Sequence, residues 1–129
     1  MPDPKYPVRN GVLCHIDGYE VPAEEPVMVF RGKDIGSLDA ICEYIEMLED
    51  QPKNNTIYSH LISSIERLNA FYFYQKQNPH LNSVGCSQRS HEGITRFFQR
   101  AEEILLRHSD ELAALSHIKN CKQPREEEF

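Results

Sequence analysis

Residues 56–77 read TIYSHLISSIERLNAFYFYQKQ. Apolar side chains recur in this stretch every three or four positions, which predicts an amphipathic helix capped by Asn55 and closed by Asn78-Pro79. Four consecutive aromatic residues, 71–74, surround the last part of that helix. A helix that is apolar all round is buried on more than one side. This part therefore predicts a deep core position or a contact with another subunit. The apolar stripe comprises Ile57, Leu61, Ile65, Leu68 and Tyr72.

Two further helices are predicted on either side of this one. The first begins with Ser37 as its N-cap and ends before Gln51-Pro52. The other begins near Ser90, and Ser109-Asp110-Glu111 can start a new helix, so the pattern leaves open one helix or two joined at His108. The first stripe comprises Leu38, Ile41, Ile45 and Leu48. The second comprises Ile94, Phe97, Ala101, Ile104 or Leu105, Leu112 and Leu115.

The N-terminal part predicts β structure. Residues 1–10 contain three prolines and predict an extended arm, whereas 11–31 predict an antiparallel meander. Asp17-Gly18 between β-type residues is a strong hairpin signal, because a type I′ turn needs positive φ at both positions. Residues 27–30, Val-Met-Val-Phe, predict a third, buried strand. Such a meander is marginally stable alone and must pack on helices.

A chain of 129 residues is expected to form one domain, residues 1–129. The predicted fold is helix-dominated α+β: a small N-terminal antiparallel β-meander packed on about three amphipathic helices. The helical region spans 37–120, and a charged tail over 121–129 is expected to be flexible. Hydrophobic residues make up 40% of the chain and Trp is absent. Such a modest core favours a homo-oligomer, because paired subunits can cover apolar faces that one subunit leaves open.

The formal net charge of −6 disfavours a duplex-DNA binder, which needs a basic face. All of that excess lies in residues 1–55, which hold eleven acidic and five basic residues. The four cysteines form no Cys-x-x-Cys pair, and the N-terminus carries no apolar signal segment. We therefore expect reduced thiols and a cytoplasmic location. No apolar run approaches the roughly 18 residues of a membrane span.

The polar stretch 80–91 leads into the N-terminus of the last predicted helix. Free backbone N–H groups and the helix dipole favour anions there. Serine hydroxyls and an arginine fork would add contacts for a phosphate or carboxylate. The candidate ligand-binding residues for a small anionic, nucleotide-like ligand are Ser87, Arg89, Ser90, His91 and Arg96. The alternative is an ordinary connection with a serine cap, since the stretch lacks both common phosphate-binding glycine patterns.

Cys86 lies in the same stretch and could act as a nucleophile, because a helix N-terminus and an arginine lower a thiol pKa. His80 or His91 could serve as its base. No cysteine-hydrolase signature surrounds it, and a buried structural thiol is the favoured interpretation. His80, Cys86 and His91, or His117 and Cys121, match no closed zinc pattern. We therefore expect no metal and no cofactor.

Acidic residues occupy one face of the first predicted helix at spacings of four, three and four. This acidic face comprises Asp39, Glu43, Glu46 and Asp50. It could bind a basic partner or mimic nucleic acid, whereas a solvated surface is the simpler alternative. The basic turn Arg31-Gly32-Lys33-Asp34 could reach a ligand, or serve only as a β-to-α connection.

In size, acidity and lack of catalytic motifs, the chain resembles small accessory proteins of bacteriophages and mobile elements. That class includes inhibitors of host defence and binders of nucleotide signals. The resemblance is compositional and assigns no residue. The first hypothesis is a non-enzymatic binding protein that contacts a host protein or sequesters a small anionic ligand. The alternatives are a small cysteine-dependent hydrolase or transferase, and a purely structural oligomer.

Overall fold

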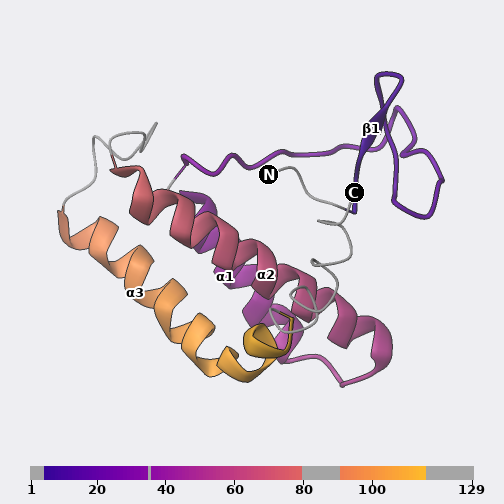
Figure 1. Ribbon diagram of the computed structural model, residues 1–129. Coiled ribbons are helices and arrows are strands. Elements are labelled where there is room, and N and C mark those ends of the chain that lie inside the picture. The colour runs from indigo at the N-terminus through magenta and orange to yellow at the C-terminus, as the bar shows by residue number, and fades with distance from the viewer. Residues whose placement is uncertain (1–4, 35, 80–90, 116–129) are drawn as a thin grey trace, which may run out of the picture. The chain divides into compact units, whose positions relative to one another are not determined.

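The computed structural model describes residues 5–34, 36–79 and 91–115, and gives 91–94 by their helical backbone alone. Its elements are arranged as helix-dominated α+β, which confirms the predicted class (Figure 1). They are, in chain order, β1 (Val8–Arg9), β2 (Val12–Leu13), α1 (Gly36–Glu49), α2 (Asn55–Gln77) and α3 (His91–Arg107), followed by a helical segment over 109–115. The chain divides into two compact units, 1–30 with the strands and 31–129 with the helices.

The hairpin lies earlier in the chain than predicted. β1 and β2 pair antiparallel, with Val8 opposite Leu13, across a turn at Asn10-Gly11. Both turn residues have positive φ, 54° and 76°, as a type I′ turn requires. The predicted Asp17-Gly18 turn also reverses the chain, because the His15 amide donates to the Tyr19 carbonyl at 2.8 Å. In the described residues, the two sides of this turn are paired by a single isolated β-bridge, between Cys14 and Glu20.

The predicted third strand over 27–30 is wrong. These residues form no strand, and all four side chains are exposed, with Met28 at 74% and Val29 at 79%. Four apolar residues in a row suit a strand buried on both faces only if neighbouring strands and helices cover it. Within the described part of the chain, their backbone groups hydrogen-bond to no other backbone group.

α1 begins one residue before the predicted cap. The Asp34 carboxylate accepts a hydrogen bond from the Gly36 amide at 3.0 Å, as a side-chain cap does. Ser37, the predicted cap, lies inside the helix and is buried; its hydroxyl donates to the carbonyls of Arg31 and Asp34. Of the predicted apolar stripe, Leu38, Ile45 and Leu48 are buried, whereas Ile41 is half-buried against the core. Cys42, which was not part of the predicted stripe, is buried as well.

α2 is capped by Asn54 instead of the predicted Asn55. The Asn54 side chain accepts from the Ile57 amide at 2.9 Å. The four aromatic residues at the end of α2 do not share one environment. Phe71 is buried and Tyr72 packs against the core, whereas Phe73 and Tyr74 are exposed. The expectation that these residues form a subunit contact stays a prediction.

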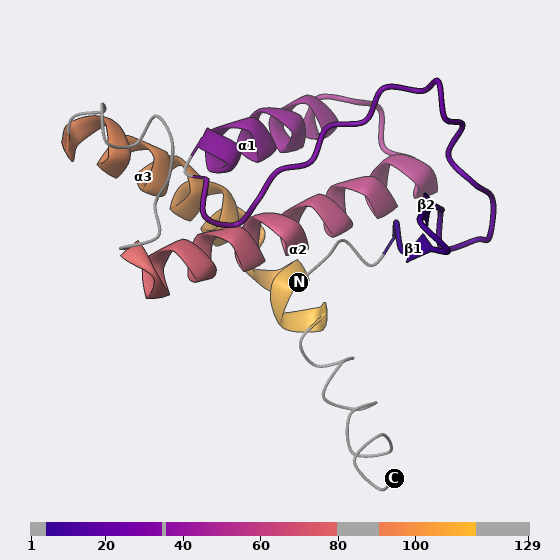
Figure 2. The ribbon, with the colours of Figure 1, turned by 90° about the horizontal axis from the view of Figure 1, so that it is seen from above.

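The core lies between α1, α2 and α3, all of which contact one another. α1 lies behind α2 in Figure 1, and Figure 2 shows these two helices side by side. α3 ends at Arg107, and a turn at His108 leads into the segment 109–115, as in the two-helix alternative. Leu112 of that segment packs on the same core. In the described residues, no helix combines the length and apolarity needed to cross a membrane. The centre of the core consists of Leu38, Cys42, Ile45, Leu48, Leu61, Ile65, Leu68, Phe71, Ala101 and Ile104.

Candidate functional site

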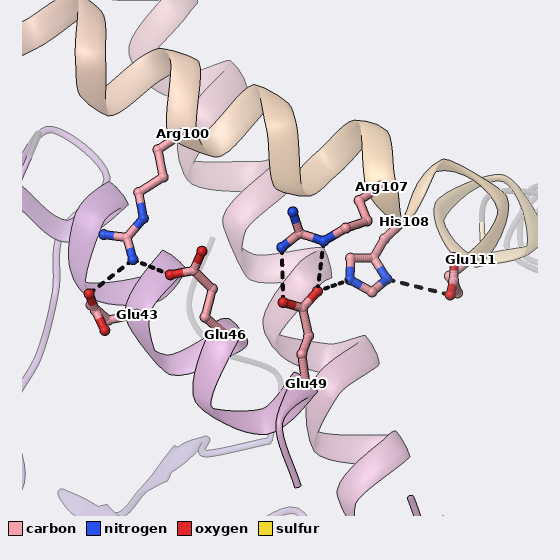
Figure 3. Close-up of polar contacts among 7 residues, drawn as sticks. All are labelled: Glu43, Glu46, Glu49, Arg100, Arg107, His108 and Glu111. Carbon is pink, nitrogen blue, oxygen red and sulfur yellow. Dashed lines mark hydrogen bonds and ion pairs between the residues drawn. The ribbon is translucent and has the colours of Figure 1, made fainter.

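The acidic face of α1 meets an arginine of α3. The Arg100 guanidinium lies 2.6 Å from an Asp39 oxygen. It also lies 2.9 Å from a Glu43 oxygen and contacts Glu46 (Figure 3). These carboxylates raise the pKa of Arg100 against the opposing effect of burial. Three of the four predicted partner-binding carboxylates therefore hold α3 against α1, while Asp50 is exposed at the end of the row.

A second ion pair joins the same helices one turn further along α1 and two turns further along α3. Nε and Nη2 of Arg107 approach the two Glu49 oxygens at 3.1 and 2.9 Å, which is bidentate geometry. Burial acts to raise the pKa of Glu49, but the hydrogen bonds from Arg107 and His108 outweigh it and lower that pKa. Glu49 therefore stays ionised, and Arg107 of the same chain partly neutralises its negative charge.

His108 closes this row at the turn after α3. Its side chain is nearly buried, with Nε2 2.5 Å from a Glu49 oxygen and Nδ1 3.4 Å from a Glu111 oxygen (Figure 3). A neutral imidazole has one N–H and can donate to only one of these carboxylates, whereas the protonated ring can donate to both. His108 thus ties the start of the segment 109–115 to the end of α1.

Side chains from the second half of α1 and from Asp50 line a shallow depression of about 570 Å³. Glu43, Glu46, Met47, Glu49 and Asp50 line it, and we call it the acidic groove. Four carboxylates, those of Asp39, Glu43, Glu46 and Glu49, contact the two guanidinium groups of Arg100 and Arg107. Asp50 adds a fifth carboxylate, so negative charge is in excess. α1 has no basic residue in its last turn, where the helix dipole is already negative. The acidic groove is therefore suited to cations.

Cys42 lies in the core below these ion pairs. Burial raises the pKa of its thiol to about 12, although the positive charge of Arg100 acts to lower it. A thiol with this pKa stays protonated at neutral pH, and the nucleophile is the thiolate. Cys42 is therefore a structural residue and not a candidate nucleophile.

The predicted anion site falls mostly outside the described residues. Ser87, Arg89, Ser90 and Cys86 belong to the range 80–90, which the structure does not describe. His91 begins α3, and Arg96 is exposed on the same helix. The anion site and the cysteine-dependent alternative therefore stay predictions. Over the described ranges, no group of three or more His, Cys, Asp or Glu residues could hold a metal ion.

The sequence did not lead us to Glu49, Arg100 and Arg107, which complete the row of ion pairs between α1 and α3. Arg100 and Arg107 are seven residues apart, so they recur on one face of a helix, as do the acidic residues of α1. Matching the spacing of the arginines in α3 with that of the acidic residues in α1 could have predicted that these two helices pack in parallel. Glu49 gave a weaker signal, because it lies beside the predicted acidic face. Comparisons of the chain with protein-family models, curated proteins and solved structures found no match.

Proposed function

We propose that the chain is a non-enzymatic binding protein that recognises a basic segment of a partner protein through the acidic groove of α1. The excess of carboxylates in an open depression is the observation that carries this proposal. A complementary positive segment would be steered toward it, and like-charged competitors would be repelled. An accessory or inhibitor protein of the class that the chain resembles in composition would act in this way.

The acidic groove also offers an apolar contact. Met47 lines it and is 44% exposed, and Tyr44 lies one turn earlier on α1 with its side chain exposed. Methionine adapts its shape to different partners because its side chain is unbranched and flexible. A tyrosine adds a large rigid surface with few rotatable bonds. A partner segment with both basic and apolar side chains would fit this combination better than a purely basic one.

The ion pairs inside the chain would assist binding by ordering the carboxylates. Arg100 holds Glu43 and Glu46, and Arg107 holds Glu49, before any partner arrives. Side chains already fixed in one conformation lose less entropy on association. Each of these carboxylates still has acceptor positions for a second donor, since an ionised carboxylate offers about four.

The test uses a synthetic amphipathic helix with lysines on one face and leucines on the other. Fluorescence anisotropy would measure its binding to the full chain and to a Glu43→Gln/Glu46→Gln/Asp50→Asn variant. We expect the triple variant to bind at least about tenfold more weakly, and wild-type binding to weaken as salt rises. Equal affinity of the variant and the wild type would contradict the proposal.

A matched control removes the same number of charges elsewhere. Glu20→Gln/Glu24→Gln/Glu103→Gln neutralises three exposed carboxylates outside the acidic groove. It should bind the peptide within about twofold of wild type, because none of these three carboxylates lines the acidic groove. A loss of affinity equal to that of the triple variant would mean that only net charge matters.

A further inference from the structure

We propose that residues 25–31 of two copies of the chain pair as antiparallel strands about a two-fold axis at Met28. The segment is apolar at its centre and has acidic residues before it and basic residues after it. Glu24 and Glu25 precede the apolar residues 27–30, and Arg31 and Lys33 follow them. The acidic groove contains none of these residues.

The segment is bounded by turns at both ends. The Glu25 amide donates to the Pro22 carbonyl at 3.1 Å, and the Asp34 amide donates to the Arg31 carbonyl at 3.0 Å. Between these turns, the four apolar side chains are exposed and their backbone groups have no backbone partner in the described chain. A segment whose backbone N–H and C=O groups are unpaired can pair with another strand, as the exposed edge of a sheet does.

The charges at the two ends of this segment favour a second copy of the chain as its binding partner, in antiparallel orientation. In a parallel pair, the glutamates of both copies would lie side by side, and so would the basic residues. In an antiparallel pair, the acidic end of each copy meets the basic end of the other. Opposite charges directly across a strand pair stabilise it, and like charges destabilise it.

Two-fold symmetry and Pro26 then fix the register. A two-fold axis perpendicular to the sheet keeps each residue on the same face in both copies, so opposed residues must differ by an even number. With Met28 facing its own copy, Val27 faces Val29 and Glu25 faces Arg31. If the Met28 pair is not hydrogen-bonded, the Val27–Val29 pairs carry the backbone bonds. The Pro26 nitrogen, which has no N–H to donate, then points away from the partner strand.

A two-stranded ribbon of this length is marginal by itself, so we expect a concentration-dependent dimer. Sedimentation velocity over a concentration series would measure the dimer dissociation constant of the full chain. Glu25→Lys and Arg31→Glu should each raise it by roughly tenfold or more, because each creates two like-charge pairs per dimer. The double variant restores opposite charges and should return the constant toward wild type. Glu20→Lys, an exposed control elsewhere in the same unit, should leave it unchanged.

A proline pair tests the register. Val29→Pro removes an N–H that would donate across the dimer, and Met28→Pro removes one that would point away from the partner. We therefore expect Val29→Pro to abolish the dimer and Met28→Pro to weaken it much less. A monomer at every concentration would overturn the proposal, as would a dimer that none of these changes affects.

A disulfide test reports contact directly. In a Cys86→Ser/Cys121→Ser background, Met28→Cys should form an intermolecular disulfide under mild oxidation, because opposed non-hydrogen-bonded residues have Cα atoms about 4.5 Å apart. Val27→Cys should not form such a disulfide, because residue 27 of one copy lies diagonally across the strand pair from residue 27 of the other. Equal cross-linking at both positions would indicate random collision and overturn the register.

Discussion

Cys42 shows how burial sets the chemistry of a single residue in this protein. It is enclosed by the core, and its raised pKa reflects the cost of placing a thiolate there, which the nearby Arg100 charge only partly offsets. The same environment that makes the thiol inert makes it a sensitive reporter of opening, because a reagent can reach it only when the helices separate.

We predict that Cys42 reacts with a thiol reagent only through opening of the helical unit. In a Cys14→Ser/Cys86→Ser/Cys121→Ser variant, labelling in native buffer should be at least about a thousandfold slower than in denaturant, as expected for a domain of ordinary stability. Mass spectrometry of timed samples would measure the rate. Similar rates in the two conditions would show that the thiol is accessible in the folded state.

Glu49 predicts how stability depends on pH at the end of α1. Its pKa is lower in the folded protein than in the unfolded chain, so the folded state binds fewer protons. Its contribution is therefore present above the unfolded pKa of about 4.3 and is lost as pH falls through the lower folded value. Glu49→Gln should cost about 1–2 kcal/mol at neutral pH and much less in acid. Denaturant titrations across this range would measure the difference, and a pH-independent cost would contradict the assignment.

At the scale of elements, the helices were predictable because each carries a stripe of apolar residues at helical spacing. Their starts were less predictable, since neighbouring residues compete to cap a helix. Asn54 caps α2 where Asn55 was expected, and Asp34 supplies the first side-chain bond of α1. The hairpin was misplaced for a similar reason: Asn10-Gly11 and Asp17-Gly18 both match the sequence pattern of a type I′ turn. Only Asn10-Gly11 has positive φ at both positions, whereas at 17–18 only Gly18 does.

The candidate site was half predictable. The spacing of Asp39, Glu43 and Glu46 marks an acidic face, but sequence alone does not show that Arg100 contacts it, because the two are over fifty residues apart. The prediction of a buried strand over 27–30 was wrong, since these side chains are exposed. A run of apolar residues indicates that burial of the segment would be favourable, but it does not show whether other parts of the chain cover that segment.

Arg100 should stabilise the packing of α3 on α1. Arg100→Met keeps an apolar stem but removes the charge that three carboxylates share. We expect a loss of about 1–3 kcal/mol in unfolding free energy, reduced by salt, which screens the remaining repulsion. Arg96→Met on the exposed side of α3 is the control and should change it by less than about 0.5 kcal/mol. Equal costs for both variants would show that the ion pairs are not the cause.

At the scale of the whole molecule, the two units differ in how they are stabilised. Every member of the main buried cluster belongs to the helical unit, 31–129. The first unit relies on a short hairpin, turns and an aromatic contact in which His15 stacks on Tyr19 with ring centres 4.8 Å apart. A two-stranded hairpin has little stability of its own. The helical unit is therefore the part expected to fold cooperatively.

This difference predicts the effect of deleting residues 1–30. The remaining chain, 31–129, should keep its helical circular dichroism and a cooperative thermal transition, because it retains the buried cluster. Its melting temperature should lie within a few degrees of that of the full chain, in proportion to the small stability lost. A non-cooperative transition or loss of helical signal would show that the first unit is needed for the fold.

Recognition of a basic partner segment through the acidic groove is tested most directly by site-specific photo-cross-linking in the cells that produce the protein. A photoreactive amino acid would replace Met47 in the groove, and in a second chain Leu106, which is 77% exposed on α3. We predict a discrete cross-link at position 47, mapping to a basic segment of one partner protein, and none of that product at position 106. No specific product at 47, or the same products at both positions, would contradict recognition through α1.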